Sequence, residues 1–265
     1  MYSRSQLFFK YLQYYFTSSN GKGHGTHSPF VFEFITKVLN DKTVYSEYER
    51  VERLRNQLLN DNSILNVEDF GAGSSVSKTN QRTVSSIARN AAKSKKIGQL
   101  LFRMVKFYQP STILELGTSL GITSSYLALA NQDARMITME GSKEIAEAAR
   151  KNFRNLEIRN LEIVEGNFDD KLSSAITQLS SIDFVFIDGN HRKEPTERYF
   201  KELLAKMNKD SILVFDDIHW SNEMEAAWEA IKNNAAVTCS IDLFFIGIVF
   251  FRKEFKEKQD FAIRF

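Results

Sequence analysis

Three acidic residues follow two short apolar segments in the second half of the chain. Asp188 ends one segment, in FVFIDGNH, and Asp216 and Asp217 end another, in LVFDDIHW. If these segments are neighbouring parallel strands, their carboxyl ends meet at one edge of a sheet, and the carboxylates converge. Carboxylate ligands suit Mg²⁺, with Ca²⁺ or Mn²⁺ as alternatives. We therefore expect a divalent metal and a reaction here, although an Asp-Asp pair can also simply cap a following helix.

A glycine-containing loop, LELGTSLG, lies upstream of these acids and opens a helical segment. Gly117 and Gly121 stand where the chain must turn sharply and let a ligand touch the backbone. The start of the helix adds free amides and a positive dipole end. A dinucleotide fingerprint has glycines at relative positions one, three and six, whereas Ser119 occupies the middle position here. The loop therefore argues against NAD(P).

The next two strand ends carry residues that suit an adenosine. Glu140 ends the strand after the glycine loop, where a carboxylate can accept hydrogen bonds from both ribose hydroxyls. Asn167, Phe168 and Asp169 follow the third strand, and an apolar ring beside amide and acid groups suits the edge of a purine. A plain turn after a strand has a similar composition. Together with the loop, these residues predict an adenosine-containing ligand across the carboxyl ends of the strands.

The pattern of apolar blocks predicts the elements that must position these residues. From about residue 113, short β-branched blocks alternate with longer helical patterns, which is typical of a parallel sheet with crossover helices. We expect strands at 113–116, 136–139, 161–164, 184–187 and 212–215, and helices at 122–130, 143–153, 171–178, 195–207 and 222–232. The segment AVTCSIDLFFIGIVFFRK has no room for a helix between its apolar blocks and predicts an antiparallel hairpin.

The first 99 residues do not show this alternation of strands and helices. Helical patterns at 29–38 and 45–59 are joined by the glycine-rich loops NGKGHGTHS and DFGAGSS, the latter at Asp69–Ser75, and a helix at 100–108 follows. His24 and His27 lie in the first loop without further metal ligands nearby in sequence. We expect residues 1–99 to form a substrate lid or an oligomer interface, with a homodimer as one outcome, and residues 100–265 to form the cofactor-binding domain.

Composition narrows the classes of function. The chain has 265 residues, and its 35 basic and 33 acidic side chains leave a formal charge of +2, which gives no general case for a polyanionic partner. A single cysteine, Cys239, excludes an internal disulfide framework and suits a reducing compartment. The start of the sequence carries Arg4 and Lys10 within its apolar stretch, so it predicts a packed helix of a cytoplasmic protein rather than a signal peptide or a membrane span. An interfacial helix on a membrane is the alternative.

Taken in order, LELGTSLG, TMEG, VEGNFDD, FVFIDGNH, LVFDDIHW and the terminal hairpin resemble the class I S-adenosylmethionine-dependent methyltransferases, particularly O-methyltransferases of the catechol and macrocin type. The resemblance covers about residues 100–251. The chain as a whole, with HGTHSPFVFEF and VEDFGAGS, also resembles a group of methyltransferase-like proteins from the Bacteroidetes. The implied fold is α/β and Rossmann-like: a seven-stranded, mostly parallel sheet with a C-terminal antiparallel hairpin and an N-terminal helical extension.

The resemblance assigns a role to each of the residues singled out above. The methionyl part of S-adenosylmethionine would lie against the glycine loop, its ribose against the turn after the second strand and its adenine after the third. Asp188, Asp216 and Asp217 would hold the divalent metal, and Asp188 would also border the cofactor. The residues implied to bind the cofactor are, in chain order, Glu115, Gly117, Thr118, Ser119, Gly121, Glu140, Gly141, Asn167, Phe168, Asp169 and Asp188.

His191 stands where the catechol-type relatives carry a lysine. A histidine can accept a proton near neutral pH, so we expect His191 to act as the base, with Asp188 as its catalytic partner. The substitution puts a catechol acceptor in doubt. His219 is a second candidate base, and Arg192 could contact an acidic group of the substrate.

The expected function is metal-assisted O-methylation of a small-molecule hydroxylated acceptor. An alternative is methylation of RNA, with phosphate contacts from a basic stretch that contains Arg82, Arg89, Lys93, Lys95 and Lys96. A solvated helix face explains those charges equally well, and no stacking-aromatic RNA motif accompanies them. A non-catalytic cofactor-binding module is a further alternative. A dehydrogenase is disfavoured by the glycine spacing and by the terminal hairpin.

Overall fold

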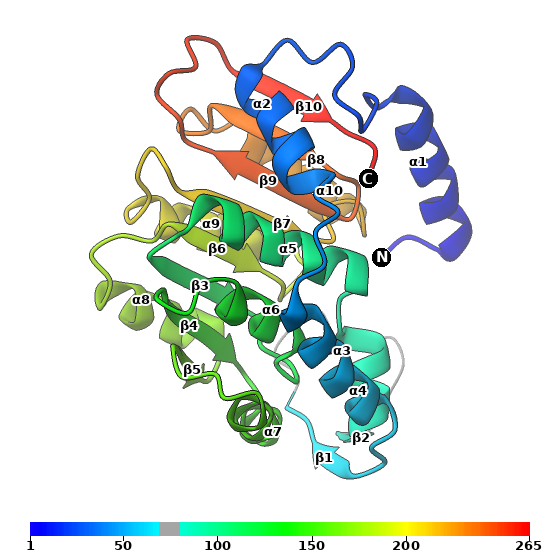
Figure 1. Cartoon of the computed structure of the whole chain (residues 1–265), viewed down its shortest axis with the longest axis vertical. Helices are drawn as coiled ribbons and strands as arrows, with labels where there is room; N and C mark the ends of the chain where they lie inside the picture. The colour runs from blue at the N-terminus through cyan, green and yellow to red at the C-terminus, as the bar shows by residue number, and fades with distance from the viewer. Residues whose placement is uncertain (69–79) are drawn as a thin grey trace. The chain divides into compact units, whose positions relative to one another are not determined.

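The computed structural model of the chain describes residues 1–68 and 80–265 (Figure 1). The described chain divides into two compact units: Met1–Asp41 with Leu179–Phe265, and Lys42–Gln178. The first 41 residues thus belong to the same unit as the C-terminal strands. The functional division expected at residue 99 stays a prediction, and the predicted DFGAGSS loop lies outside the described residues.

In the unit Lys42–Gln178, parallel strands alternate with helices as predicted. The strands β3 (Thr112–Leu116), β4 (Arg135–Glu140) and β5 (Leu161–Glu165) are neighbours in this order, and Leu116 pairs with Met139. They are connected by α6 (Ile122–Ala130) and α7 (Lys143–Asn155), and α8 (Phe168–Thr177) follows β5. Strand β3 is buried after its first residue because its side chains are apolar apart from Glu115.

Helix α8 begins three residues earlier than the sequence pattern suggested. We expected a helix from residue 171, but Phe168 and Asp169 already form its first turn. The side chain of Asn167 accepts a hydrogen bond from the backbone N–H of Asp169 at 3.1 Å and caps the helix. The polar segment that resembled a turn is therefore a capped helix start.

The remaining elements of this unit come from the N-terminal extension. They are α3 (Ser46–Leu59), the antiparallel pair β1 (Ile64–Asn66) and β2 (Gln81–Thr83), α4 (Val84–Ala91) and α5 (Lys95–Tyr108). Helix α5 begins at Lys95 rather than at residue 100, because the side chain of Ser94 accepts from the N–H of Ile97 and caps it. At Gly98 an added Cβ would lie 2.6 Å from the ring of Tyr126, so only glycine lets α5 pack this closely on α6.

The other unit holds the predicted fourth and fifth strands and the C-terminal hairpin. Strand β6 (Phe184–Ile187) pairs in parallel with β7 (Ile212–Asp216), and β9 (Ile246–Phe250) pairs antiparallel with both β7 and β8 (Cys239–Asp242). The hairpin is thus confirmed. A further strand that we did not predict, β10 (Gln259–Ala262), pairs in parallel with β8. Helices α9 (Lys193–Leu204) and α10 (Asn222–Lys232) belong to the same unit.

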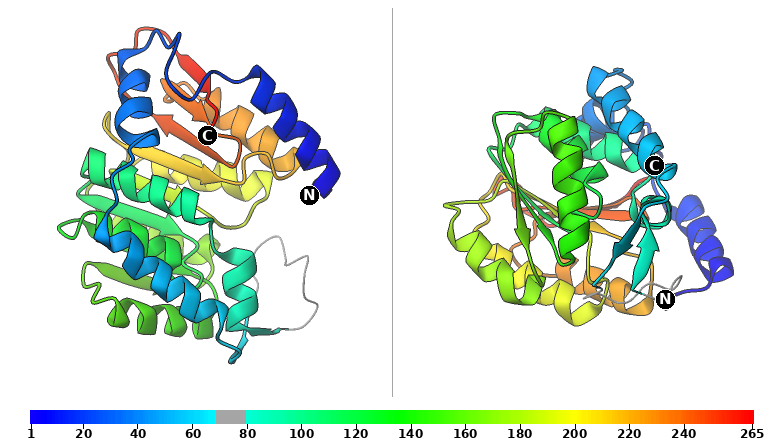
Figure 2. Two further views of the ribbon diagram at one scale, coloured as in Figure 1. Left: turned by 45° about the vertical axis from the view of Figure 1, so that its right-hand side comes forward. Right: turned by 90° about the horizontal axis from the view of Figure 1, so that it is seen from below.

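The N-terminal segment of this unit packs on its C-terminal strands. It contains α1 (Arg4–Thr17), α2 (Pro29–Glu33) and a π-helix, η1 (Phe34–Leu39), that continues α2. The Tyr14 hydroxyl of α1 donates to the carbonyl of Ile263, and Tyr2 donates its N–H to the carbonyl of Trp220 at 3.0 Å. Figure 2 shows α1 lying beside α10. Within the described residues, no helix combines the length and the apolar character that crossing a membrane requires.

Candidate functional site

The predicted convergence of the two acid groups is present within one unit. Strands β6 and β7 pair in parallel up to Ile187 opposite Phe215, and Asp188 and Asp216 are the next residues along each strand. Carboxylate oxygens of Asp188 and Asp216 and a ring nitrogen of His191 all lie within 4.8 Å of one another. Asp216 is buried, and Asp188 and His191 are partly exposed. Two strands and the turn after β6 therefore assemble an acid–imidazole cluster.

The turn after β6 fixes the position of His191. Asn190 has a positive φ of 52° and is buried, and its side-chain amide donates to the Tyr199 hydroxyl at 3.0 Å. The side-chain oxygen of Asn190 also accepts from Arg192 Nε at 2.8 Å. Between these two anchors, His191 Nε2 lies 3.6 Å from Asp188 Oδ1. Arg192 thus supports this turn, and its predicted contact with an acidic group of the substrate stays a prediction.

Asp217 stands apart from the cluster that Asp188, His191 and Asp216 form in the described part of the chain. Its φ is positive, 53°, and its N–H donates to the carbonyl of Phe245 at 2.7 Å. Its carbonyl accepts from the N–H of Trp220 at 3.0 Å. The backbone therefore turns sharply at Asp217, directly after the end of β7. The role of Asp217 as a metal ligand stays a prediction.

The donor set of the cluster can hold a divalent cation. Carboxylate oxygens suit Mg²⁺, Ca²⁺ and Mn²⁺, and a neutral imidazole is also a ligand for several transition metals. His191 is the residue that sequence reasoning placed beside the metal as a base, and the geometry brings it within ligand distance as well. The same three side chains could therefore bind an ion together, or bind it through the acids while His191 handles a proton.

The residues predicted to bind a nucleoside gather around Glu140 in the other unit. The Glu140 carboxylate accepts the N–H of Ser119 at 2.8 Å through one oxygen and the N–H of Ser142 at 2.9 Å through the other. Its carbonyl accepts from the N–H of Gly166 at 2.9 Å. Glu140 thus ties together the glycine loop, the turn after β4 with Gly141, and the turn that leads to Asn167.

The glycine loop owes its shape to its glycines and to the strand beside it. Gly117 and Gly121 have φ values of 111° and 81°, which other residues rarely adopt. The N–H groups of Gly117 and Thr118 donate to the carbonyl of Met139 at 3.1 and 3.0 Å. A Cβ at Gly121 would lie 2.5 Å from the ring of Phe153. These positions explain why this loop needs glycine at both ends of GTSLG.

Glu115 lies beneath this loop in a fully buried polar network. Its carboxylate accepts from the hydroxyl of Thr138 at 2.6 Å and from the hydroxyl of Ser124. The Thr138 hydroxyl is 2.7 Å from that of Thr118 in the loop. Glu115 has no exposed surface in this structure. Its contacts hold the loop in place, whereas its predicted contact with the methionyl group stays a prediction.

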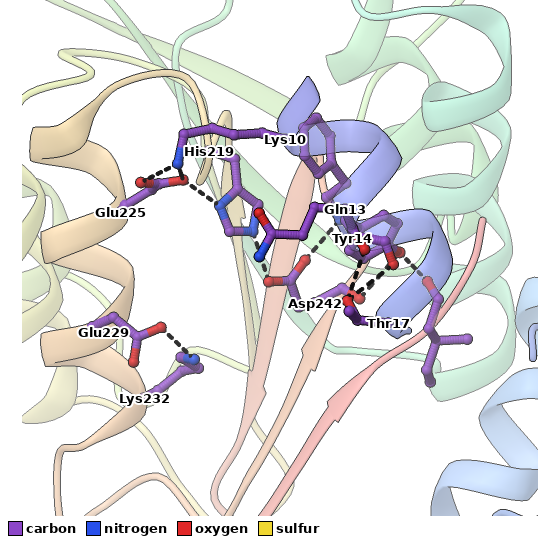
Figure 3. A network of polar contacts seen from close by, with 11 residues as sticks. Lys10, Gln13, Tyr14, Thr17, His219, Glu225, Glu229, Lys232 and Asp242 are labelled. Atoms are coloured by element: carbon purple, nitrogen blue, oxygen red, sulfur yellow. Dashed lines mark hydrogen bonds and ion pairs between the residues drawn. The ribbon is translucent and has the colours of Figure 1, made fainter. Parts of the chain in front are cut away.

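Sequence reasoning missed a polar network around His219, which Figure 3 shows. His219 Nδ1 lies 3.0 Å from Glu225 Oε1, and Nε2 lies 2.8 Å from Asp242 Oδ2. Burial lowers the pKa of His219, but the hydrogen bonds and charges of Asp242 and Glu225 outweigh this effect and raise it. The raised pKa favours the charged form of the ring, and the role of His219 as a second candidate base stays a prediction. Because Glu225 and Asp242 belong to different elements, no pattern of neighbouring residues in the sequence could predict that they contact His219.

Comparisons with known proteins agree with this geometry. Residues 114–218 match a family described as a methyltransferase domain. A catechol O-methyltransferase of Niastella koreensis is 28% identical over 124 residues, which are 46% of this chain and 55% of the relative. A malonyl-[acyl-carrier protein] O-methyltransferase of Legionella pneumophila is 26% identical over 184 residues, 65% of this chain and 60% of the relative. The chain thus spans less than two thirds of the length of either curated relative.

Solved structures share the fold at low sequence identity. An O-methyltransferase of Bacillus cereus in complex with SAH has a TM-score of 0.56 at 20% identity and covers 83% of this chain and 97% of its own. The tomaymycin-synthesis O-methyltransferase of Streptomyces achromogenes, in complex with SAM, has a TM-score of 0.54 at 22% identity and covers 62% and 82%. With the matched residues 114–218 and the strand-end sites described above, these likenesses identify the fold. The chain therefore shares the fold of these methyltransferases, and its residues 114–218 match a methyltransferase-domain family.

Proposed function

We propose that the chain is an S-adenosylmethionine-dependent O-methyltransferase that acts on a small hydroxylated acceptor with the help of a divalent metal. The acid–imidazole cluster of Asp188, His191 and Asp216 carries this proposal, because it combines ligands for a hard cation with a group that can take up a proton. The matches to a catechol O-methyltransferase and to the methyltransferase-domain family support it.

In the unit Lys42–Gln178, Glu140 would hold the ribose of the methyl donor. Its carboxylate is already oriented by the N–H groups of Ser119 and Ser142, so little rotamer freedom is left to lose on binding. The turn with Asn167 and Phe168 would face the adenine, and the backbone of the glycine loop would face the methionyl part. These residues bind and orient the donor and take no part in proton transfer.

Asp188 and Asp216 would hold the metal, with Asp217 as a further ligand from the same loop. When bound, the metal would draw the acceptor hydroxyl into place and lower its pKa. His191 would accept the hydroxyl proton at Nε2 as the oxygen attacks the methyl carbon. An O–C bond then forms while the S–C bond of the sulfonium breaks, and the charge of the sulfonium is lost. The protein would position the acceptor hydroxyl relative to the methyl donor and provide a proton acceptor.

A methyl-transfer assay tests this function. The purified chain would be incubated with methyl-labelled S-adenosylmethionine and a panel of catechols, other phenols and aliphatic hydroxy acids, with Mg²⁺ or with EDTA. We expect labelled methyl ether from at least one small acceptor, with Mg²⁺ required. RNA in the same panel tests the alternative substrate. Binding of NAD without binding of S-adenosylmethionine, measured by calorimetry, would refute the proposal.

A further inference from the structure

Helix α1 is apolar on two opposite faces, and only one of them is covered. On the covered face, Tyr14 is buried, and the rings of Tyr11 and Tyr14 lie 5.1 and 5.3 Å from the ring of Phe244. At 3.6 residues per turn, the opposite face carries Phe8, Phe9, Leu12, Tyr15 and Phe16. A helix that is apolar all round is normally buried all round. Among residues 1–68 and 80–265, this helix therefore has no neighbour that buries its outer face.

The exposed rings lie along the outer side of α1 and on the connection between β8 and β9. Phe245, in the connection between β8 and β9, stacks on Tyr11 with ring centroids 6.0 Å apart, and Tyr11 lies 6.4 Å from Tyr15. We call the five exposed rings the aromatic surface. Its members are Phe8 (58% exposed), Phe9 (68%), Tyr15 (43%), Phe16 (77%) and Phe245 (51%).

The aromatic surface has a defined position, because polar contacts attach the opposite side of α1 to the rest of its unit. The Lys10 ammonium lies 2.9 Å from Glu225 Oε1, and the Tyr2 hydroxyl donates to Glu225 Oε2 at 2.7 Å. Figure 3 shows Lys10 and Tyr14 pointing from α1 into this network. A capping box of Ser3 and Gln6 closes the start of the helix. The exposure of the rings is thus a property of a docked helix.

The area of the surface matches half of a stable protein interface. The exposed fractions add up to about three whole aromatic side chains, or about 600 Å² at about 200 Å² per ring. Exposed apolar patches of this size on a monomer usually mark an interaction site. Two such surfaces face to face would bury about 1,200 Å², and bordering residues would bring the total near the standard interface of about 1,600 Å².

The charges on and beside α1 help to distinguish a second copy from a membrane as the partner of the aromatic surface. The five rings carry no charge themselves, although the guanidinium of Arg264 lies 4.9 Å from the centroid of the Tyr15 ring. Arg4 lies in the first turn of α1, which holds no acidic residue, and the last turn holds no basic one. In an antiparallel pair, Arg4 of each copy would approach the C-terminal end of the other helix, where Arg264 Nε already donates to the carbonyl of Ser18 at 3.3 Å. The area of the surface, rather than its charges, therefore carries the choice of a second copy as the partner. Lys10 faces Glu225 rather than the outer side, which suits a membrane surface less well.

We propose that the aromatic surface binds the same surface of a second copy of this chain, with the two α1 helices antiparallel about a twofold axis near Leu12. Such a contact is isologous and closes on itself as a dimer. It is independent of the proposed methyl transfer, since none of its residues belongs to the acid–imidazole cluster or to the residues around Glu140.

Sedimentation analysis of the full chain tests the dimer. We expect a dimer for the native chain and a monomer for the double variant Phe9→Ser, Phe16→Ser, which removes the two most exposed rings of α1. Val44→Ser is the matched control, because Val44 is 90% exposed but lies outside the surface, and it should stay dimeric. Circular dichroism and thermal unfolding check that each variant is folded.

Cross-linking tests the arrangement. Leu12→Cys should form an intermolecular disulfide on mild oxidation, because Leu12 would face its own copy across the twofold axis, whereas Gln13→Cys on the flank of α1 should not. Cys239 is buried and contributes no background. A native chain that stays monomeric at the highest soluble concentration overturns the proposal. Sedimentation of that monomer with anionic lipid vesicles would then assign the surface to a membrane instead.

Discussion

At the scale of single residues, the acid–imidazole cluster depends on a register between two strands. Because β6 and β7 pair in parallel and end together, Asp188 and Asp216 are brought side by side without help from any loop. His191 needs the buried Asn190 in a positive-φ conformation to reach them. The two carboxylates are thus positioned by the sheet, and the imidazole is positioned by a turn.

Metal affinity should depend on both strand-end acids. Asp216→Asn keeps the shape of the side chain but removes the charge, and we expect it to weaken Mn²⁺ binding roughly 100-fold or more. Electron paramagnetic resonance of free Mn²⁺ measures this without any substrate. Asp210→Asn, at the other end of β7, makes the same charge change on an exposed side chain and should leave affinity unchanged. Equal affinity in Asp216→Asn and native protein would remove the metal site from the proposal.

His191 should serve as a proton acceptor. His191→Gln keeps a polar side chain of similar length but cannot take up a proton, so kcat for methyl transfer should fall by about 10²- to 10⁴-fold. KM for the acceptor and the affinity for Mn²⁺ should change little. A parallel loss of Mn²⁺ affinity would instead make His191 a metal ligand, as its distance from Asp188 and Asp216 also permits.

At the scale of elements, α1 is attached to α10 chiefly through one carboxylate. Glu225 accepts hydrogen bonds from Lys10 of α1 and from Tyr2, which precedes α1, and it also contacts His219, as Figure 3 shows for Lys10 and His219. Burial raises the pKa of Glu225, but these hydrogen bonds outweigh it and hold the pKa below its usual 4.5. A carboxyl with a lowered pKa stabilises the fold above its unfolded pKa and loses this contribution as the pH falls through its folded value.

Glu225→Gln should therefore destabilise the chain in a pH-dependent way. Near pH 6 we expect a loss of about 1 kcal/mol in the free energy of unfolding, a value that allows for solvent screening of this partly exposed group. The difference from the native chain should vanish as the pH falls below 4.5. Urea unfolding across this range measures it. Glu229→Gln is the control on the same helix, since Glu229 pairs only with Lys232 in the contacts of Figure 3. A pH-independent difference would contradict this assignment.

The sequence predicted those elements whose signal is local. Strands such as Phe184–Ile187 and Ile212–Asp216 are short apolar blocks next to polar residues, and the structure has them at nearly the predicted positions. Helix starts at Lys95 and Phe168 were missed because a capping side chain lies within polar sequence. Strand β10 was missed because it is only partly buried and has no apolar block.

The residues of the candidate site also fall into those that the sequence could predict and those that it could not. The strand-end acids Asp188 and Asp216 and the ribose candidate Glu140 could be predicted, because a strand followed by an acid is visible in the sequence. The network of Lys10, Glu225 and Asp242 could not, since its members are far apart in the chain and meet only through packing. The same holds for the grouping of residues 1–41 with 179–265.

At the scale of the whole molecule, the two sets of candidate residues lie in different compact units. The residues around Glu140 belong to Lys42–Gln178, and the acid–imidazole cluster belongs to the other unit. The contacts that orient Glu140 come from Ser119 and Ser142 of its own unit. We therefore expect the nucleoside part of the cofactor to bind without the metal, and the metal to bind without the cofactor.

Thermal unfolding with S-adenosylhomocysteine tests this independence. At 100 times Kd the ligand should add about 2.7 kcal/mol of stability, which raises Tm by roughly 5–10 °C for a chain of this size. The shift should persist in EDTA and disappear in Glu140→Gln, because an amide cannot accept hydrogen bonds from both ribose hydroxyls and both backbone N–H groups as well. Mn²⁺ affinity of Glu140→Gln should equal that of the native chain, and Asp216→Asn should keep the full shift in Tm. A shift that needs the metal would show instead that the two sets of residues bind their ligands as one site.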